Sequence, residues 1–175
     1  MTTKQPPKQL MAARADFLAR WGALGPAWGV SRTLSQIHAL LMVAPEACNT
    51  DEIMAELGIS RGNAHANITE LCEWGLLRKI KRPGDRKDYY EAEKDVWRVV
   101  QSITRARKRK ELEPVLQTLG DCLAQTRGLK DARSRAFRKQ LSELERFAKL
   151  GDQVMRRVAE GRSSRILPWI LKFLK

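Results

Sequence analysis

Residues 49–93 read NTDEIMAELGISRGNAHANITELCEWGLLRKIKRPGDRKDYYEAE and carry, in this order, the patterns of two short helices and a β-hairpin. The first helix is expected to begin at Asn49, because an Asn side chain accepts from the free amides of a first turn. Glu52, three residues on, completes a capping box. Gly58 stands where the helix ends, since glycine adopts the left-handed conformation that closes a helix. The pattern predicts a helix of about two turns.

Ser60 is the expected N-cap of a second helix over residues 61–74, which Gly75 closes. Two helices joined by so short a connection cross at a steep angle, as in a helix-turn-helix. On a helix of about 3.6 residues per turn, the apolar side chains gather on one side and face the core. Small and amide side chains cover the rest of the surface near the start of this helix.

This surface suits contact with base edges in the major groove of DNA. Asn63 and Asn67 carry the paired donor and acceptor that match adenine, and the methyl group of Ala66 suits thymine. Gly62 and Ala66 leave room for a close approach. The residues of this helix expected to contact DNA are Ser60, Arg61, Gly62, Asn63, His65, Ala66, Asn67 and Thr69.

The hairpin follows directly, with strands predicted over residues 76–81 and 88–93 around a Pro-Gly-Asp turn. We name residues 76–93 the wing, because a hairpin after a helix-turn-helix is typical of a winged helix. Six of the residues from 78 to 87 are basic and one is acidic, a density suited to a phosphate backbone. A solvated hairpin without a partner is the alternative. The wing residues expected to contact DNA are Lys79, Lys81, Arg82, Asp85, Arg86 and Lys87.

The sequence resembles the MarR superfamily of bacterial regulators, and within it the GbsR-like branch, in WGVSRTLSQIHALL (28–41), TDEIMAELGISRGNAHANITELCEWGLL (50–77) and GDRKDYYEAEKDVW (84–97). The resemblance extends over about residues 16–123. It implies a homodimeric transcription factor, usually a repressor, whose recognition helix corresponds to residues 61–74. Family members carry Asp-x-Arg at the wing tip and place its cation in the minor groove. Here the tip is Asp85-Arg86-Lys87, which leaves Arg86 and Lys87 as alternatives for that role.

The rest of the chain predicts helices, so the expected fold class is mainly α with a small β-hairpin. It combines a winged helix-turn-helix with a helical dimerisation module. We expect residues 1–30 to form an N-terminal helix within the dimerisation frame. Residues 31–94 form the DNA-binding domain, and residues 95–175 form a helical region for dimerisation and sensing.

Asp95 opens the first helix of this C-terminal region. Its expected buried face consists of Val96, Val99, Val100 and Ile103. Pro114 is expected to break or kink the helix, because proline lacks the amide hydrogen that a helix interior requires. A shorter helix follows, up to a turn at Gly128.

From residue 132 to residue 159, apolar side chains recur at alternating steps of four and three, the spacing of a helix-pairing seam. We expect this seam to form a homodimer, because paired recognition helices need a second subunit. Packing onto the N-terminal helix of the same chain is the alternative. The predicted seam consists of Phe137, Leu141, Leu144, Ala148, Gly151, Met155 and Val158. The apolar and basic residues 165–175 are too short to span a bilayer, and we expect them to cap the dimer interface.

The composition predicts a cytoplasmic protein. Of the 175 residues, 43% are hydrophobic, which excludes general disorder. The N-terminus lacks the apolar core of a signal peptide, and three cysteines without regular spacing favour a reducing compartment. The net charge of +13 is unevenly distributed: residues 1–94 hold 13 basic and 11 acidic residues, and residues 95–175 hold 20 and 9. A basic run at residues 105–110 would add phosphate attraction near a DNA-binding unit, although most such runs are solvated helix faces.

No arrangement in the sequence is typical of an enzyme, a metal site or a cofactor site. His38 and His65 are the two histidines, and neither has metal-ligand spacing to the cysteines. Within the GbsR-like branch, relatives respond to quaternary ammonium compounds, which aromatic faces hold. Trp21, Trp28 and Trp97 are therefore the candidate contacts for a small-molecule inducer, with packing anchors as the simpler alternative. A thiol switch at Cys72 is another option.

Two hypotheses of function follow. The first is a dimeric, sequence-specific DNA-binding regulator that recognises an inverted repeat. The second is a winged helix that binds an acidic protein partner through its basic surface. Steep salt dependence of DNA binding distinguishes the first from the second.

Overall fold

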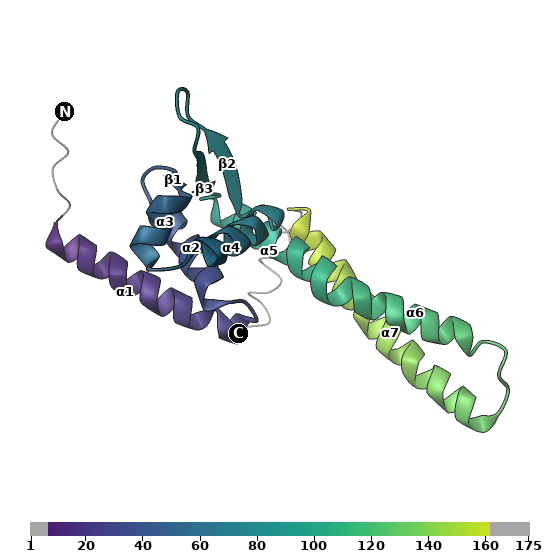
Figure 1. Cartoon of the computed structure of the whole chain (residues 1–175). Coiled ribbons are helices and arrows are strands. Elements are labelled where there is room, and N and C mark those ends of the chain that lie inside the picture. Colours follow the sequence, from purple (N-terminus) through teal and green to yellow (C-terminus); the bar gives the residue numbers. More distant parts are fainter. Residues whose placement is uncertain (1–6, 162–175) are drawn as a thin grey trace. The chain divides into compact units, whose positions relative to one another are not determined.

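The computed structural model describes residues 7–161, and the chain divides between Asp95 and Val96 into two compact units (Figure 1). Helices dominate both units, and the first contains a small three-stranded antiparallel sheet. The predicted fold class, a mainly α chain with a winged helix, is confirmed. The tail at residues 165–175, expected to cap a dimer, lies outside the described residues.

The first unit is built around α2 (Arg32–Val43). The preceding helix α1 (Lys8–Leu24) packs on α2 and is joined to it through the 3-10 turn η1 (Pro26–Trp28). Ser31 is the N-cap of α2, and its hydroxyl accepts a 2.9 Å hydrogen bond from the Leu34 amide. The largest side chains that α2 buries completely are Ile37, Leu40 and Leu41.

The helix-turn-helix consists of α3 (Thr50–Leu57) and α4 (Arg61–Glu73), as predicted. The capping box of α3 is complete: Asn49 Oδ1 accepts from the Glu52 amide at 3.1 Å, and Glu52 Oε2 accepts from the Asn49 amide at 2.7 Å. Gly58 ends α3 with a φ of 63°, in the left-handed region. The Ser60 hydroxyl then caps α4 by accepting from the Asn63 amide.

The wing is formed by β2 (Leu77–Lys81) and β3 (Asp88–Ala92), which pair antiparallel from Leu77↔Ala92 to Lys81↔Asp88. This confirms the predicted hairpin. A further strand, β1 (Cys48–Asn49), pairs with the other edge of β3 and gives the order β1-β3-β2. No pattern in the sequence predicts β1, because two residues are too short to show the alternation of a strand.

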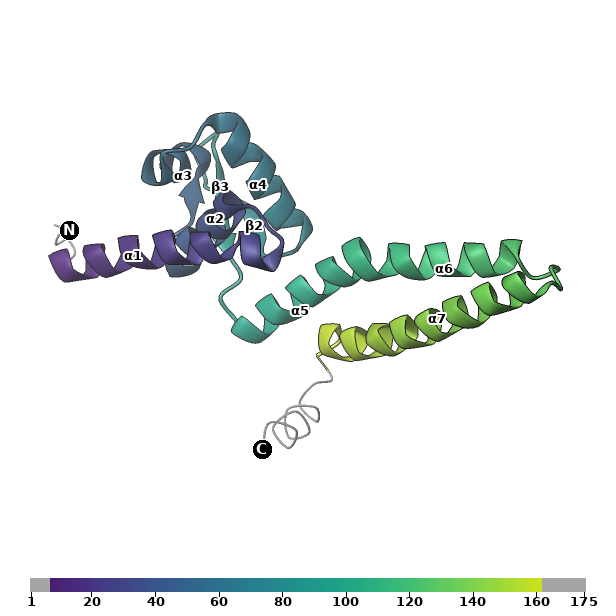
Figure 2. The same cartoon turned by 90° about the horizontal axis from the view of Figure 1, so that it is seen from below.

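The second unit begins with α5 (Val96–Arg107), which continues through the π-helical turn η2 (Lys108–Leu112) into α6 (Glu113–Gln125). Pro114 lies in the first turn of α6. A proline at this position has no amide hydrogen to donate to the preceding turn, and the π turn just before it shifts the hydrogen-bond register. The expected break at Pro114 is therefore a change of helix type within a continuous rod (Figure 2).

The predicted buried face of α5 is wrong for two of its valines. Val96 and Val100 are 63% and 38% exposed, whereas Val99 is buried at 8% exposure. The reason is that α5 packs against α7 along a narrow strip that runs through Val99, Ser102 and Ala106. Apolar residues beside that strip remain at the surface.

The long helix α7 (Ala132–Ala159) has the predicted length and runs back beside α6 and α5 (Figure 2). Part of the predicted dimer seam packs within the single chain. Ala148 is buried within the single chain, and Leu141, Gly151, Met155 and Val158 are half-buried. Within the second unit, α7 packs against α5, η2 and α6 of the same chain.

A different face of α7 is exposed. Phe137 and Leu144, the other two members of the predicted seam, are each 48% exposed. They lie among further exposed apolar residues of the same helix, and we name this set the outer face of α7: Phe137, Leu144, Phe147, Leu150 and Val154. Within residues 7–161, no helix is long and apolar enough to cross a bilayer.

Candidate nucleic-acid interface

The first two turns of α4 present an open surface. Seven of the eight residues predicted to contact DNA are exposed there: Ser60, Arg61, Gly62, Asn63, His65, Ala66 and Thr69. A side chain added at Gly62 would meet no atom within 4 Å, so a partner can approach the helix backbone at this point. The eighth residue, Asn67, is buried.

The burial of Asn67 corrects its predicted role as a base contact. Its amide nitrogen donates to the backbone oxygen of Asn63 at 2.8 Å and to Asn63 Oδ1 at 2.7 Å. Its amide oxygen accepts a 2.8 Å hydrogen bond from the Ser31 hydroxyl. Both ends of the Asn67 amide are therefore occupied by the protein, and the side chain joins α4 to the start of α2.

Asn63 is exposed, and two hydrogen bonds within the protein hold the orientation of its side-chain amide. Asn63 Oδ1 accepts from Asn67, and Asn63 Nδ2 donates a long hydrogen bond, 3.4 Å, to the Thr33 hydroxyl. A carbonyl oxygen has two lone pairs and an amide nitrogen has two hydrogens, so one acceptor position and one donor position remain for a ligand. This is the donor and acceptor pair that an adenine edge requires.

Asp51, at the start of α3, connects α4 to the wing. Its carboxylate forms ion pairs with Arg61 Nη2 at 2.7 Å and with Lys87 Nζ at 3.1 Å. Hydrogen bonds from Lys87 and then Arg61 lower the pKa of Asp51, and the Asp51 carboxylate raises the pKa of Lys87. The role of Asp51 is not predictable from the sequence, because its partners are distant along the chain and no local pattern indicates them.

Most cations of the wing have carboxylate partners. Arg78 pairs with Glu91 across the two strands, and Lys79 and Lys81 share the carboxylate of Asp88, at 2.6 Å from Lys79. Hydrogen bonds from these two lysines lower the pKa of Asp88. A DNA phosphate would compete with Asp88 for both ammonium groups.

Arg82 and Asp85, predicted to contact DNA, also make contacts within the first unit. The Arg82 guanidinium lies 4.0 Å from the centroid of the Tyr89 ring and donates to the Ala47 carbonyl oxygen at 3.1 Å. Asp85 accepts from the Lys87 amide at 2.8 Å and from the Tyr89 hydroxyl at 2.7 Å, and these hydrogen bonds lower its pKa. Gly84 takes a φ of 80° within this turn, in the left-handed region.

Arg86 is the cation at the wing tip for which the described residues provide no partner. It is exposed, and no hydrogen bond or ion pair involves its side chain within residues 7–161. Its neighbour Lys87 is held by Asp51. Of the two alternatives for the minor-groove cation, Lys87 therefore has a carboxylate partner, and Arg86 has none within residues 7–161.

The three tryptophans predicted to contact an inducer belong to α1, η1 and α5. Trp21 and Trp28 are in edge-to-face contact, with ring centroids 5.3 Å apart, and Phe17 adjoins Trp21 at 5.5 Å. Trp97 belongs to α5 of the second unit. Burial raises the pKa of the Cys72 thiol, which lowers its thiolate fraction and disfavours a thiol switch.

His38 lies within α2 and is buried. The residue is 8% exposed, and burial lowers the pKa of its imidazole to about 4. Across the described residues, no group of three or more His, Cys, Asp and Glu side chains is placed to hold a metal ion.

Comparisons with known proteins point to the same part of the chain. A model of the MarR family matches residues 28–88, about a third of the chain, from η1 to the start of β3. A comparison with proteins of curated function finds no significant match.

Several solved structures are similar to the chain. One described as a transcriptional regulator aligns with a TM-score of 0.67 and 19% identity, over 87% of this chain and 99% of that chain. A transcriptional regulator from Thermotoga maritima has a TM-score of 0.39 and 16% identity, over 86% of this chain and 99% of its own. A MarR-family regulator from Rhodococcus sp. RHA1 has a TM-score of 0.38 and 17% identity, over 81% and 96%. At these identities the first likeness shows the fold, and the other two are too distant to add to it.

Proposed function

We propose that the chain is a MarR-superfamily transcriptional regulator that binds DNA as a homodimer. The observation that carries the proposal is the exposed, sterically open start of α4, where the Asn63 amide retains one donor position and one acceptor position beyond its hydrogen bonds to Thr33 and Asn67. The wing lies beside it and is tied to α4 through Asp51. The MarR family match extends over α3, α4 and β2 and supports the same role.

In this proposal α4 enters the major groove. Gly62 and Ala66 allow the helix backbone to approach the bases, and Asn63 and His65 contact base edges. Ser60, Arg61 and Thr69 surround these two residues and bind the phosphate backbone. Asn67 takes no part in base contact and acts as a positioning residue for Asn63.

The wing contributes affinity more than sequence recognition. We assign the minor-groove contact to Arg86, whose guanidinium has no partner in the described part of the chain. Lys79, Lys81 and Lys87 bind phosphates by exchanging a carboxylate partner for a phosphate oxygen. Arg82 and Asp85 keep the turn in shape.

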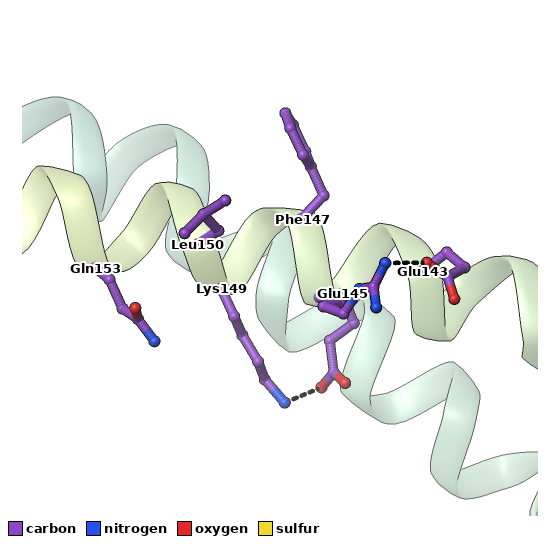
Figure 3. A pocket seen from close by; sticks show the side chains of 7 residues that line it. Glu143, Glu145, Phe147, Lys149, Leu150 and Gln153 are labelled. Atoms are coloured by element: carbon purple, nitrogen blue, oxygen red, sulfur yellow. Dashed lines mark ion pairs between the residues drawn. The ribbon is translucent and has the colours of Figure 1, made fainter.

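Dimerisation is assigned to the outer face of α7 in place of the predicted seam. Phe147 is 77% exposed and Leu150 is 58% exposed, beside a groove lined by the ion pairs Glu143–Arg146 and Glu145–Lys149. Figure 3 shows Phe147 projecting away from the ribbon of α7. A second copy would bury this apolar surface, and two recognition helices about 34–36 Å apart would then fit an inverted repeat.

The finer features of the proposal rest on the resemblance alone. The GbsR-like branch and the repressor activity follow from the residues quoted above, and a quaternary ammonium inducer would be held by the Trp21 and Trp28 faces. The rival hypothesis is a winged helix that binds an acidic protein, and it predicts no steep salt dependence of DNA binding.

The test selects an operator from a random-sequence DNA pool and then measures affinity at several salt concentrations. We expect log K to fall steeply with log salt, and we expect Asn63→Ala to reduce discrimination between operator and random duplex. Lys81→Ala serves as the matched control, because loss of a phosphate contact weakens all sequences alike. Failure to enrich any sequence, together with a flat salt response, would reject the proposal in favour of a protein partner.

A further inference from the structure

The connection between α6 and α7 carries an unusual concentration of positive charge. We name residues 127–139 the hairpin tip, and it joins the two helices at one end of the second unit (Figure 1). Its cations are Arg127, Lys130, Arg133, Arg135, Arg138 and Lys139. Between Asp121 and Glu143 the sequence contains one acidic residue, Asp131.

That single carboxylate is used by the fold. Asp131 is the N-cap of α7 and accepts from the Ser134 amide at 2.9 Å and from the Ser134 hydroxyl at 2.5 Å. In the part of the chain that the structure describes, no carboxylate pairs with any of the six cations. Arg135 and Arg138 donate to the backbone oxygens of Lys130 and Thr126, and these acceptors are neutral. The charge of the hairpin tip therefore remains uncompensated.

In the middle and at the end of α7, basic side chains do form ion pairs with carboxylates of the same helix. Three of its basic residues there have an acidic partner three or four residues earlier. The pairs are Arg146–Glu143 at 3.0 Å, Lys149–Glu145 at 2.8 Å and Arg156–Asp152 at 2.6 Å. The sequence places no such partner beside the cations of the hairpin tip.

The position of these cations also costs helix stability. The N-terminus of a helix is the positive end of its dipole, where acidic residues are favourable and basic residues are unfavourable. The first turn of α7 contains no acidic residue, and Arg133 and Arg135 lie close to its start. A local arrangement that opposes folding is expected where a binding function compensates for it.

We propose that the hairpin tip is a second DNA-contact surface, which binds the phosphate backbone of the duplex without recognising its sequence. Arginine binds phosphate through two parallel hydrogen bonds, and four of the six cations are arginines. The inference rests on the proposed function for the identity of the polyanion, since duplex DNA is the one that such a regulator encounters.

A membrane surface fits the hairpin tip less well than DNA. An interfacial helix needs a continuous apolar face that inserts below the lipid headgroups. The large exposed apolar side chains of the hairpin tip are Leu129 and Phe137, at 50% and 48% exposure, and cations surround them.

The test uses the full chain with Arg127→Gln, Lys130→Gln and Arg133→Gln combined. These side chains are exposed and make no hydrogen bond or ion pair within residues 7–161. Binding to a random-sequence duplex of about 60 base pairs is measured against salt. We expect the slope of log K against log salt to become shallower by up to about 2.7, at about 0.9 for each lost phosphate contact. The thermal midpoint should stay level or rise, because cations near a helix N-terminus have been removed.

The matched control is Lys8→Gln, Arg20→Gln and Arg157→Gln, which changes the net charge equally at other exposed positions. Equal slopes for the two triple variants would overturn the inference. Loss of binding to vesicles containing about 30% phosphatidylserine, with DNA binding unchanged, would overturn it in favour of a membrane partner.

The same assay separates this inference from the proposed function. Discrimination between operator and random duplex depends on α4, so the hairpin-tip variant should keep that ratio and Asn63→Ala should lose it. A wild-type chain without sequence discrimination but with the shift in slope would reject the proposed function and support the hairpin tip. A wild-type chain with sequence discrimination, together with an unchanged slope in the hairpin-tip variant, would reject the DNA-contact role of the hairpin tip and leave the proposed function standing.

Discussion

The hydroxyl of Ser31 donates a 2.8 Å hydrogen bond to the amide oxygen of Asn67. The same hydroxyl accepts from the Leu34 amide as the N-cap of α2, so one side chain both begins a core helix and holds α4. Asn67 passes this constraint on by donating to Asn63. The orientation of the exposed Asn63 amide therefore depends on the start of another helix, 36 residues away from Asn67 in sequence.

Replacing Asn67 by Ala should affect stability and sequence recognition together. The Ser31 hydroxyl and the Asn63 amide each lose a part-buried partner, so the free energy of unfolding in urea should fall by about 1–3 kcal/mol. Freed from Asn67, the Asn63 amide can rotate, and discrimination between operator and random duplex should decrease in a binding titration.

The control is His65→Ala on the exposed side of α4. It should leave the free energy of unfolding within about 0.5 kcal/mol of the wild type and change recognition alone. Unchanged discrimination in Asn67→Ala would show that Asn63 is oriented by something other than this hydrogen-bond chain.

Arg86 and Arg82 in the wing should respond differently to the same substitution. Arg86→Gln removes no contact seen in residues 7–161, so stability should be unchanged, while the salt slope of DNA binding should become shallower by about 0.9. Arg82→Gln removes a cation–π contact with Tyr89 and should cost about 0.5–1 kcal/mol of stability. Urea unfolding and salt titration of both variants check this, and a larger loss of DNA affinity in Arg82→Gln would reverse the assignment.

Local sequence patterns predicted the parts of the fold that local contacts determine. Three of these features are each formed by residues that are close in sequence, and the structure contains all three. They are the capping box at Asn49 and Glu52, the Ser60 cap and the Pro83-Gly84 turn. The burial of Asn67 was not predictable in this way, because it depends on Ser31 in a distant segment.

The two faces of α7 show a second limit. Its apolar residues recur at the spacing of a helix seam on more than one side, and spacing alone does not say which side meets its own chain. The structure uses Ala148 for internal packing and leaves Phe147 exposed one position earlier. Which side of α7 is buried depends on the helices packed beside it, and this packing is a property of the tertiary structure.

His38 should make stability depend on pH. Burial lowers the pKa of its imidazole from 6.5 to about 4, so the unfolded chain takes up the proton more readily than the folded chain. Above about pH 6.5, titration of His38 should not reduce the free energy of unfolding. As the pH falls from about 6.5 toward 4, this titration should lower the free energy of unfolding by up to about 3 kcal/mol. Urea unfolding at pH values of about 7, 5.5 and 4.5 measures the slope.

His38→Leu should flatten this slope, because the titrating group is gone while an apolar side chain still fills the core position. His65→Ala should keep the slope, since His65 is exposed. If His38→Leu retained the full pH dependence over this interval, other groups would be responsible for it.

Phe147→Glu tests the outer face of α7 as the dimer surface. The side chain is 77% exposed in the single chain, so the substitution should leave the fold of the subunit intact. In a dimer that buries this face, the new carboxylate would lose its hydration without gaining a partner, which costs several kcal/mol per ion and favours the monomer. Sedimentation analysis should show a wild-type dimer and a variant monomer, and affinity for an inverted repeat should fall toward that for a single half-site. Ser142→Glu adds the same charge at an exposed position on this helix that does not line the groove beside Phe147, and it should stay dimeric. A dimer that persists in Phe147→Glu would move the interface away from α7, because no apolar contact centred on this ring would tolerate the charge.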